Sequence, residues 1–268
     1  MDLDLARRLE RTEGAVSASF PPVKQRVAPG SNATWHDFAG TYAIFDGVDS
    51  PMTQTFGLGL FEAATPALLS DIEAFFDQRG APIMHEVSPL AGVEALALLT
   101  DRGYRPIELS TVLAQGIEGA VGAPASHDLR VRRMEPADRP AWVDASVAGW
   151  ANDPTFAAIM RSLAEVASAN EAMSHFLVER DGAPIATGSM GIHDGVALLA
   201  GASTIPSERG RGTQAILLAA RLAEARRQRC EIAMMVAAPG STSQRNAERN
   251  GFRVAYTRTK WRLARPAS

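Results

Sequence analysis

Three apolar segments follow one another closely at residues 176–179, 185–191 and 196–204, and the turns between them contain Asp181-Gly182 and Asp194-Gly195. An Asp-Gly pair between two apolar runs is a strong signal for a tight β-hairpin. The three segments therefore predict an antiparallel meander. This order argues against an open parallel sheet built from strand–helix–strand units.

The segments on either side of the meander predict a regular order of elements. Before it we expect a strand at 129–132, a helix from Pro136 to Gly149 and a second helix beyond Pro154. After it we expect a helix, a strand, a helix and a strand, at 212–228, 232–237, 241–250 and 252–261. The second half of the chain thus has the predicted order βααβββαβαβ.

The first half predicts a similar mixture. Apolar spacing favours helices at 3–18, 66–79 and 91–102, and strands at 41–45, 53–60, 83–87 and 105–114. Residues 115–126 are small and Gly-rich and have no apolar period, which is typical of an exposed linker. The length of 268 residues allows two ordinary domains, so we expect one at 1–125 and one at 126–268.

A similar five-residue pattern occurs in each of the two halves. The segments 101–105 and 249–253 each place a predicted helix end, a glycine, an aromatic residue and an arginine in the same order. A duplication of one ancestral half would explain this similarity. Ordinary helix-exit chemistry, in which a glycine after the helix leads into a strand, would explain it as well.

Composition excludes several classes of protein. The net charge is -3 and the pI is about 6.0, which argues against a dedicated binder of nucleic acid or of an anionic membrane. The single cysteine, Cys230, excludes an internal disulfide framework and a multi-thiolate metal site. It also favours a reducing compartment, and we expect the cytoplasm because residues 1–14 mix acids and bases instead of forming an apolar export signal.

The most informative segment is Pro206-Ser207-Glu208-Arg209-Gly210-Arg211-Gly212-Thr213-Gln214, which follows an apolar strand and opens a long helix. Glycines let the backbone approach a ligand, and the first N–H groups of a helix have no intrahelical acceptor. Such a turn can bind a pyrophosphate, with Arg209 and Arg211 supplying charge. An ordinary surface turn with solvated arginines is the alternative. The segment fits neither the P-loop pattern nor the dinucleotide pattern GxGxxG.

At this point the chain resembles the GNAT superfamily of acyl-CoA-dependent N-acyltransferases. Residues 129–262 share its order of elements, its loop pattern [QR]xxGx[GA] at Arg209, Gly212 and Gln214, and its final Gly251-Phe252. Gln214 departs from the Gly or Ala that the family prefers. The resemblance implies an α/β (α+β) fold of two GNAT-like domains, each a mixed, mostly antiparallel sheet flanked by helices. The first would be degenerate, because the stretch before Pro66 has no RxxGxG equivalent.

The resemblance also implies a site for acetyl-CoA as cosubstrate, without a metal. The family binds the pyrophosphate with loop amides and pantetheine in the gap between two splayed strands. Carried over, this assigns binding roles to the following residues: Thr204, Ile205, Arg209, Gly210, Arg211, Gly212, Thr213, Gln214, Ser243 and Asn246. Ser243 and Asn246 can instead be an ordinary helix-start residue and a solvated polar residue.

The catalytic residues stay unidentified at this level. The position of the family's tyrosine acid is occupied by Ala247, and Tyr256 lies too far along the final strand to replace it. An attacking amine must lose a proton, so a general base or a water relay is expected. Glu179, at a strand end, is a weak candidate, and Asp194 is better explained by its turn.

The leading functional hypothesis is transfer of an acetyl group from acetyl-CoA to an amine of a small molecule or peptide, by direct attack in a ternary complex. The alternative is a non-catalytic acyl-CoA sensor or pseudoenzyme, which the departures at Ala247 and Gln214 favour. A sugar-phosphate or nucleotide binder that uses the same loop is a third possibility. The expected partners are acetyl-CoA and a small amine-bearing acceptor, with no nucleic acid and no membrane, in a monomer or homodimer.

Overall fold

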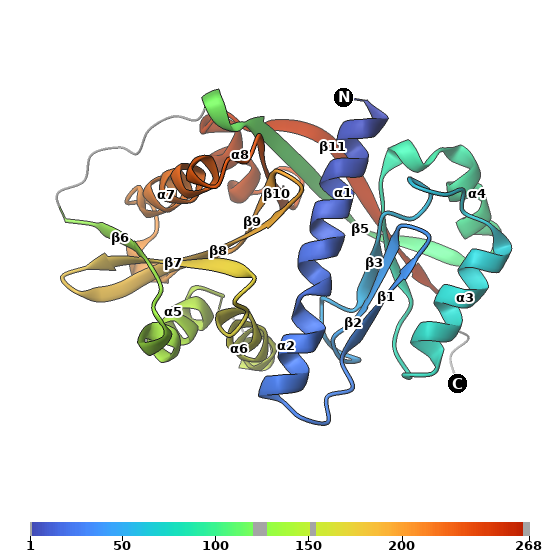
Figure 1. The fold of residues 1–268 in the computed structure, drawn as a ribbon, viewed down its shortest axis with the longest axis horizontal. Coiled ribbons are helices and arrows are strands. Elements are labelled where there is room, and N and C mark those ends of the chain that lie inside the picture. Colours follow the sequence, from blue (N-terminus) through green and yellow to red (C-terminus); the bar gives the residue numbers. More distant parts are fainter. Residues whose placement is uncertain (1, 120–127, 151–153, 265–268) are drawn as a thin grey trace. The chain divides into compact units, whose positions relative to one another are not determined.

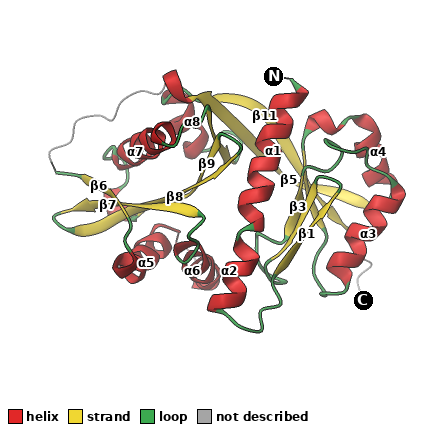
Figure 2. Ribbon diagram, in the orientation of Figure 1, coloured by secondary structure: helices red, strands yellow, loops and turns green. Residues whose placement is uncertain are grey.

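The computed structural model describes residues 2–119, 128–150 and 154–264 (Figures 1 and 2). The chain divides into two compact units whose segments alternate along the sequence. Unit 1 consists of Met1–Leu113, Val236–Arg245 and Val254–Ser268, and unit 2 of Ala114–Met235 and Asn246–Arg253. Each unit is a layer of strands flanked by helices, which confirms the predicted fold class.

The described residues of unit 1 include the helices α1 (Leu3–Ala18), α2 (Phe20–Val27), α3 (Pro66–Asp77) and α4 (Val93–Asp101), and the first half of α8 (Thr242–Arg249). Its strands lie in the order β1-β2-β3-β4-β11-β5, with bounds Thr34–Phe38, Thr41–Phe45, Gln54–Phe56, Met84–Val87, Arg253–Leu263 and Tyr104–Gly116. β3 and β4 are parallel, whereas β1–β2, β2–β3 and β4–β11 are antiparallel. The C-terminal strand β11 is therefore part of the sheet of the N-terminal unit.

The alternation of side chains along β2 explains how the helices of unit 1 are layered. Ala43 and Phe45 belong to a core cluster that includes apolar residues of α3 and α4, such as Leu69 and Leu99. Ile44, between them, packs instead with Ala18 at the end of α1. Since successive strand residues point to opposite faces, α1 covers one face of the sheet, and α3 and α4 cover the other.

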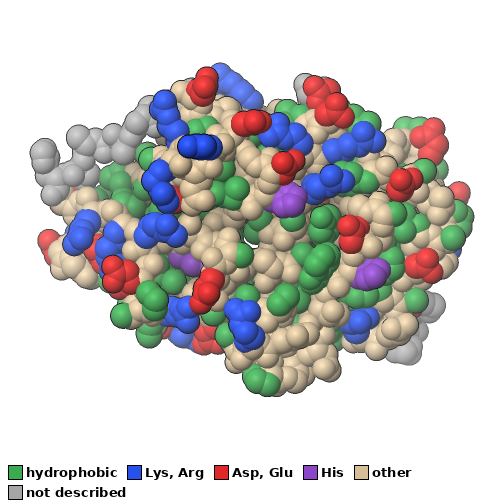
Figure 3. Space-filling model, viewed as in Figure 1, with side chains coloured by type: hydrophobic (Ala, Val, Ile, Leu, Met, Phe, Trp, Pro, Cys, Tyr) green, Lys and Arg blue, Asp and Glu red, His purple; other side chains and the backbone are tan. Residues whose placement is uncertain are grey.

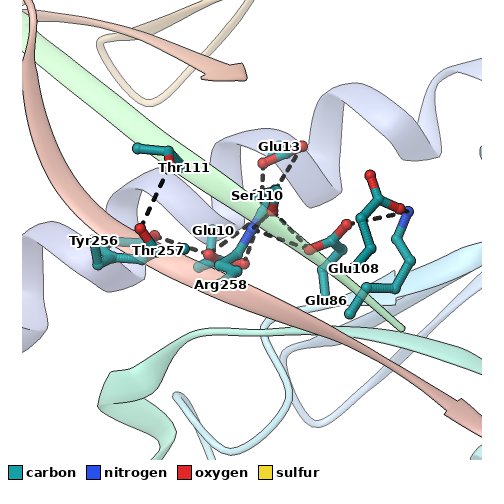
Figure 4. A network of polar contacts seen from close by, with 10 residues as sticks. Glu10, Glu13, Glu86, Glu108, Ser110, Thr111, Tyr256, Thr257 and Arg258 are labelled. Atoms are coloured by element: carbon teal, nitrogen blue, oxygen red, sulfur yellow. Dashed lines mark hydrogen bonds and ion pairs between the residues drawn. The ribbon is translucent and has the colours of Figure 1, made fainter. Parts of the chain in front are cut away.

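Unit 1 also encloses an ionic network, shown in Figure 4. Arg258 on β11 is 1% exposed, and its guanidinium lies 2.7 Å from a Glu13 oxygen, 3.3 Å from Glu10 and 3.4 Å from Glu86. The Tyr256 hydroxyl donates to Glu10 over 2.8 Å. This arrangement ties α1, β4 and β11 together through charges that are removed from water.

After the end of β5, unit 2 continues with β6 (Arg130–Arg133), the 3-10 turn Pro136–Asp138, α5 (Arg139–Trp150) and α6 (Pro154–Ser168). The meander follows as β7 (Met173–Arg180), β8 (Ala183–His193) and β9 (Val196–Thr204), and then α7 (Thr213–Arg227) and β10 (Ile232–Ala237). α8 (Thr242–Arg249) precedes β11. The strands of unit 2 lie in the order β10-β9-β8-β7-β6 and are antiparallel, except for the parallel pair β9–β10.

Two helices sandwich the meander of unit 2. Trp142 and Val143 of α5 pack against Leu177 of β7, which places α5 on one face. A Cβ atom built on Gly188 of β8 would lie 3.1 Å from Leu217 and 3.3 Å from Arg221, both on α7. Gly188 alternates with Thr187 and Ser189, so α7 covers the opposite face of β8.

The structure differs from the sequence prediction at four points in the first 120 residues. α2, whose first turn contains Pro21 and Pro22, was not predicted, and neither was β1, a largely exposed strand at the edge of the sheet. The predicted strand 53–60 is limited to β3, since Gly57 and Gly59 adopt positive φ angles of 86° and 77°. The predicted linker is structured at its start, where β5 runs to Gly116 and the buried Ile117 donates its N–H to Glu231 O. The rest of that linker, and the proposed boundary at 125/126, lie within 120–127, outside the described residues.

Among the described residues, helices long and apolar enough to span a bilayer are absent.

Candidate functional site

A gap opens in the sheet of unit 2 where β9 and β10 part. Their described parallel pairing joins Val196–Leu198 to Ile232–Met234 and ends there. β9 continues to Thr204, and in this second stretch Gly201 is exposed although most of the strand is buried. A central strand that is exposed in the middle leaves its backbone open to a ligand.

A β-bulge marks the same stretch of β9. Thr187 pairs with Ser203, but Ser189 pairs with Ala200, so Gly201 and Ala202 together oppose Gly188. Gly201 has a φ of 60°, in the left-handed region. A bulge redirects backbone groups, and bulges are common beside active sites.

The turn after β9 has the geometry of an anion site. A short 3-10 turn, Pro206–Glu208, leads to Gly210 and Gly212, whose φ angles are 76° and 78°. Gly212 is the N-cap of α7 and has no side chain to cap it, so the N–H groups of Thr213 and Gln214 lack intrahelical acceptors. The side chain of Arg211 is 58% exposed beside them. Free amides, the helix dipole and a cation thus coincide at one helix start.

The first motif residue, Arg209, has a structural role. Its guanidinium donates to Gly149 O over 2.7 Å and to Thr204 O over 3.2 Å, which joins the end of α5 to the end of β9. The backbones there are close, since a Cβ atom on Gly149 would lie 2.6 Å from Ser203 Cβ. Arg209 therefore braces the turn and does not point its charge away from it.

Gln214 folds back onto the strand in the same way. Its Nε2 donates to Thr204 Oγ1 over 2.6 Å and to Ser203 O over 3.2 Å. The side chain of Gln214 is thereby held against the end of β9. Two pantetheine contacts were predicted at the end of β9. The N–H of Ile205, which follows the strand, already donates to Ile185 O, and the carbonyl and hydroxyl of Thr204 accept from Arg209 and Gln214.

The charges around the turn are partly compensated. Glu208 lies 3.0 Å from Arg180 and 3.8 Å from Arg211. Arg180 pairs with both Asp128 and Glu208, and the guanidinium of Arg211, although 3.8 Å from Glu208, is exposed and can also contact an anion at the helix start.

The helix α8 carries the remaining predicted binding residues. Ser243 is exposed in its first turn, and Asn246 is half-buried one turn later, where its carbonyl accepts a hydrogen bond of 2.7 Å from Asn250 Nδ2. Ala247, which stands where the family has a tyrosine, is fully buried. Contacts of Ser243 and Asn246 with a pantetheine arm stay predictions.

Other candidates from the sequence are held in structural interactions. Glu179 forms an ion pair of 2.7 Å with Arg132, Asp194 occupies the β8–β9 turn with a φ of 45°, and Tyr256 belongs to the ionic network of unit 1. The Cys230 thiol is buried, and burial raises its pKa, which makes a reactive thiolate unfavourable. His85 is also buried, with Nδ1 2.7 Å from Thr55 Oγ1, and burial lowers its pKa to about 4.

Sequence reasoning missed a set of buried polar side chains on the α5 face of unit 2. They are His175 on β7, Thr187 and Ser189 on β8, and Ser203 on β9. Thr187 Oγ1 lies 3.0 Å from Ser203 Oγ, and Ser189 Oγ lies 2.9 Å from His175 Nδ1. The sequence signal was a set of polar residues at alternate positions in strands that are otherwise apolar.

The corresponding turn of unit 1, residues 57–65, is closed by its own side chains. Leu58 and Leu60 are buried, and Phe61 packs so closely that Cβ atoms on Gly40 and Gly57 would lie 2.5 Å and 2.9 Å from its side chain. From α1, Arg7 Nε donates to Leu60 O over 2.7 Å, and Arg11 lies over the Phe61 ring. A turn filled in this way leaves no exposed glycine backbone comparable to that at Gly210 and Gly212.

Clusters of three or more His, Cys, Asp or Glu side chains able to hold a metal ion are absent from the part of the chain that the structure describes. On the face drawn in Figure 3, acidic and basic side chains are interspersed with apolar and neutral ones.

Comparisons with known proteins agree with this architecture. Residues 140–252 match the model of the acetyltransferase (GNAT) family. A GCN5-related N-acetyltransferase from Kribbella flavida is 17% identical, with a TM-score of 0.67 over 94% of this chain and 96% of that one. A GCN5-related N-acetyltransferase from Sphaerobacter thermophilus is 16% identical, with a TM-score of 0.60 over 80% of this chain and 73% of that one.

A tandem GNAT protein from the clavulanic acid biosynthesis pathway is 12% identical, with a TM-score of 0.62 over 97% of this chain and 95% of that one. At these identities the structures establish a shared fold. A comparison with curated protein sequences gave no match. We conclude that the chain contains a domain of the acetyltransferase (GNAT) family at residues 140–252, within a fold shared with GNAT proteins that include a tandem one.

Proposed function

We propose that this protein transfers an acetyl group from acetyl-CoA to an amine of a small molecule or peptide. The observation that carries the proposal is the turn from Arg209 to Gln214, which presents free amides and the exposed Arg211 at the start of α7. This turn belongs to the segment that matches the acetyltransferase family. The donor site is therefore assigned to unit 2.

The pyrophosphate of coenzyme A would be bound by the backbone of Gly210, Arg211, Gly212 and Thr213, with further charge from Arg211. Two negative charges at a helix start gain from the dipole and from unpaired N–H groups. Arg209 and Gln214 would contribute by holding the turn against Thr204. Pantetheine would then run along β9 past Thr204 and Ile205 toward the bulge, with Asn246 of unit 2 as a further contact.

The thioester group of acetyl-CoA would lie at the bulge of β9. Gly201 lies three residues before Thr204, which is roughly 10 Å along a strand. A backbone N–H at the bulge can polarise the thioester carbonyl as negative charge develops on its oxygen. The amine attacks the carbonyl carbon directly in a ternary complex, the C–S bond breaks, and the electron pair leaves with sulfur.

Departure of the thiolate does not require a tyrosine acid. Ala247 has no proton to give, and the Tyr256 hydroxyl already donates to Glu10. A thiol has a pKa of about 8.5, so a thiolate is a tolerable leaving group and can take its proton from water. We place the enzyme in the cytoplasm, which suits its single buried thiol, as a monomer or homodimer.

A non-catalytic acyl-CoA sensor is the second candidate, favoured by the apolar, buried Ala247. It predicts binding of acetyl-CoA without turnover. Release of free thiol from acetyl-CoA in the presence of ethanolamine, putrescine, tyramine or a lysine-containing peptide, with formation of the acetylated amine, would rule the sensor out.

Isothermal titration with acetyl-CoA tests the donor site. We expect saturable binding by the wild-type protein and a Kd raised about 10- to 100-fold in Arg211→Glu, which places a carboxylate beside the pyrophosphate. Arg226→Glu, at the exposed far end of the same helix, makes the same charge change and should bind normally. Absence of heat with millimolar acetyl-CoA, or ADP binding as tightly as coenzyme A, would refute the proposal.

A further inference from the structure

A chain of hydrogen bonds runs through the α5 face of unit 2. His175 on β7 is 6% exposed, and Ser189, opposite it on β8, is 3% exposed. His175 Nδ1 lies 2.9 Å from Ser189 Oγ, and its Nε2 lies 3.2 Å from the backbone oxygen of Asn170. Trp142 of α5 packs edge-on against the imidazole, with ring centroids 5.3 Å apart. Both nitrogens of a buried histidine are thus held in place.

The partners determine where the hydrogens lie. A carbonyl oxygen can only accept, so the hydrogen of the neutral imidazole is on Nε2 and points at Asn170 O. The lone pair of Nδ1 then faces Ser189, whose hydroxyl must be the donor. Burial lowers the pKa of His175, the hydrogen bond to Asn170 O offsets part of this effect, and the nearby cations Arg139 of α5 and Arg133 of β6 lower the pKa further. The resting state is therefore a neutral base that accepts a hydrogen bond from a serine hydroxyl.

This pair lies directly beside the exposed bulge. Ser189 pairs with Ala200, the residue before Gly201, and a Cβ atom built on Gly201 would lie 3.8 Å from Ser189 Oγ. Gly201 is exposed, in the stretch of β9 that extends beyond its pairing with β10. Because Gly201 has no side chain, a molecule bound at the bulge could approach the Ser189 hydroxyl through the open space beside Gly201.

We propose that Ser189 and His175 form the proton relay that accepts a proton from the attacking amine. This proposal rests on the proposed function. The amine nitrogen forms its bond to the thioester carbon and the C–S bond breaks. The nitrogen then passes a proton to Ser189 Oγ while the hydroxyl hydrogen of Ser189 moves to His175 Nδ1. The imidazolium keeps its Nε2–H bond to Asn170 O and later returns its proton through solvent to the thiolate, which yields amide and free thiol.

Ser189 is the catalytic residue in this relay, because it would touch the amine, whereas His175 acts through it. A positioned base typically contributes 10²- to 10⁴-fold to the rate. Ser189→Ala should therefore lower kcat at least a hundredfold in the amine assays above, while the Kd for acetyl-CoA changes less than threefold. Ser189→Thr, which keeps a hydroxyl, should recover much of the rate.

The matched control is Ser168→Ala. Ser168 is another buried serine of unit 2, 5% exposed, and its hydroxyl donates to Glu165 O at the end of α6. We expect this variant to retain wild-type kcat and Kd. The acid limb of the kcat profile should report His175 in the wild type, with an apparent pKa below 6.5, and should disappear in His175→Gln.

Three results would overturn the relay while leaving acetyl transfer intact: wild-type kcat in Ser189→Ala, an equal loss in Ser168→Ala, or an acetylated Ser189 in the working enzyme. Nuclear magnetic resonance of ¹⁵N-labelled wild-type protein adds a test that needs no variant. We expect His175 in the Nε2–H form, and an Nδ1–H form would contradict the proposal. Acetyl-CoA binding without turnover of any amine by the wild type would instead refute the proposed function, and the relay with it.

Discussion

Gly212, the N-cap of α7, combines an unusual backbone conformation with open surroundings. Its φ of 78° is a left-handed conformation that costs other residues roughly 1–2 kcal/mol, and a Cβ atom there would meet nothing within 4 Å of the protein. The site needs both properties, because the same open space is where a pyrophosphate would contact the first amides of α7. A methyl group at this position therefore affects backbone strain and ligand access together.

Gly182 offers a control that separates the two effects. It has a φ of 79° in the β7–β8 turn and, like Gly212, open space around a built Cβ atom. We expect Gly212→Ala and Gly182→Ala to lower the free energy of unfolding by similar amounts, about 1–2 kcal/mol. Only Gly212→Ala should weaken binding of coenzyme A, measured by calorimetry. Equal affinities in the two variants would show that the ligand does not reach the start of α7.

Sequence analysis could locate the loop at this scale but not the targets of its side chains. Glycine and arginine between a strand and a helix predict an anion site, because the groups that bind the anion all belong to one short segment of the sequence. That Arg209 reaches Gly149 on α5 depends on packing between segments 60 residues apart, which no local pattern encodes. The sequence predicts that Arg209 supplies charge to a ligand, whereas in the structure its guanidinium binds backbone oxygens of α5 and β9.

At the scale of elements, the ionic network holds α1 against β4 and β11 in unit 1. Removing one member of a buried charge cluster costs about 3–5 kcal/mol, because its partners stay buried without compensation. Arg258→Met would leave Glu10, Glu13 and Glu86 without their shared cation. We expect a loss of that size in chemical denaturation. Arg262→Met, an exposed position on the same strand, should change stability by less than about 0.5 kcal/mol.

The network also predicts a dependence of stability on pH. Burial raises the pKa of Glu10 from 4.5 to about 7, a shift that the attraction of Arg258 only partly offsets. The folded state therefore binds more protons than the unfolded state between about pH 4.5 and 7. The contribution of Glu10 to stability is full below this window and declines as the pH rises through it.

Glu10→Gln replaces the carboxyl with a neutral group and should remove this decline. Relative to the wild type, the variant should gain about 1–3 kcal/mol in unfolding free energy between pH 5 and pH 8. Denaturation at several pH values measures the difference, with Glu62→Gln, an exposed position outside the network, as the control for loss of a carboxylate. A variant whose stability relative to the wild type falls with rising pH would contradict the raised pKa.

Element order was predictable and strand register was not. Counting back from the Asp181-Gly182 turn, and from the pair Arg180 and Ala183, would place His175 opposite Gly188. An irregularity between Val178 and Glu179 shifts the register by one residue, so His175 faces Ser189 instead. A shift of one residue moves a side chain to the other face of a sheet, and this is why the relay could not be found from the sequence.

At the scale of the whole molecule, the two units are interleaved along the chain. A division at one point, between 125 and 126, would leave β11 with the second half, although β11 pairs with β4 of unit 1 through Val87–Thr259 and Met84–Arg262. Long-range pairing of this kind carries no local signature, so the membership of β11 in the sheet of unit 1 could not be predicted from composition. The division into functional domains stays a prediction.

A fragment consisting of residues 126–268 tests the interleaving. It would carry β11 without its β4 partner and would expose Tyr256, Arg258 and Trp261, which are buried in the full chain. We expect this fragment to be poorly soluble and unit 1 to be unfolded in a chain that ends at residue 252. Circular dichroism and size-exclusion chromatography measure both, and a well-folded monomeric fragment 126–268 would contradict the assignment of β11 to unit 1.

Hydrogen–deuterium exchange of the intact protein, with and without saturating coenzyme A, tests the central claim most directly. The claim is that the donor binds at the open turn of unit 2 and not at the closed turn of unit 1. We predict slower exchange at residues 199–215 on ligand addition and unchanged exchange at 57–65. Protection confined to 57–65, or protection in neither segment at saturating ligand, would contradict the account.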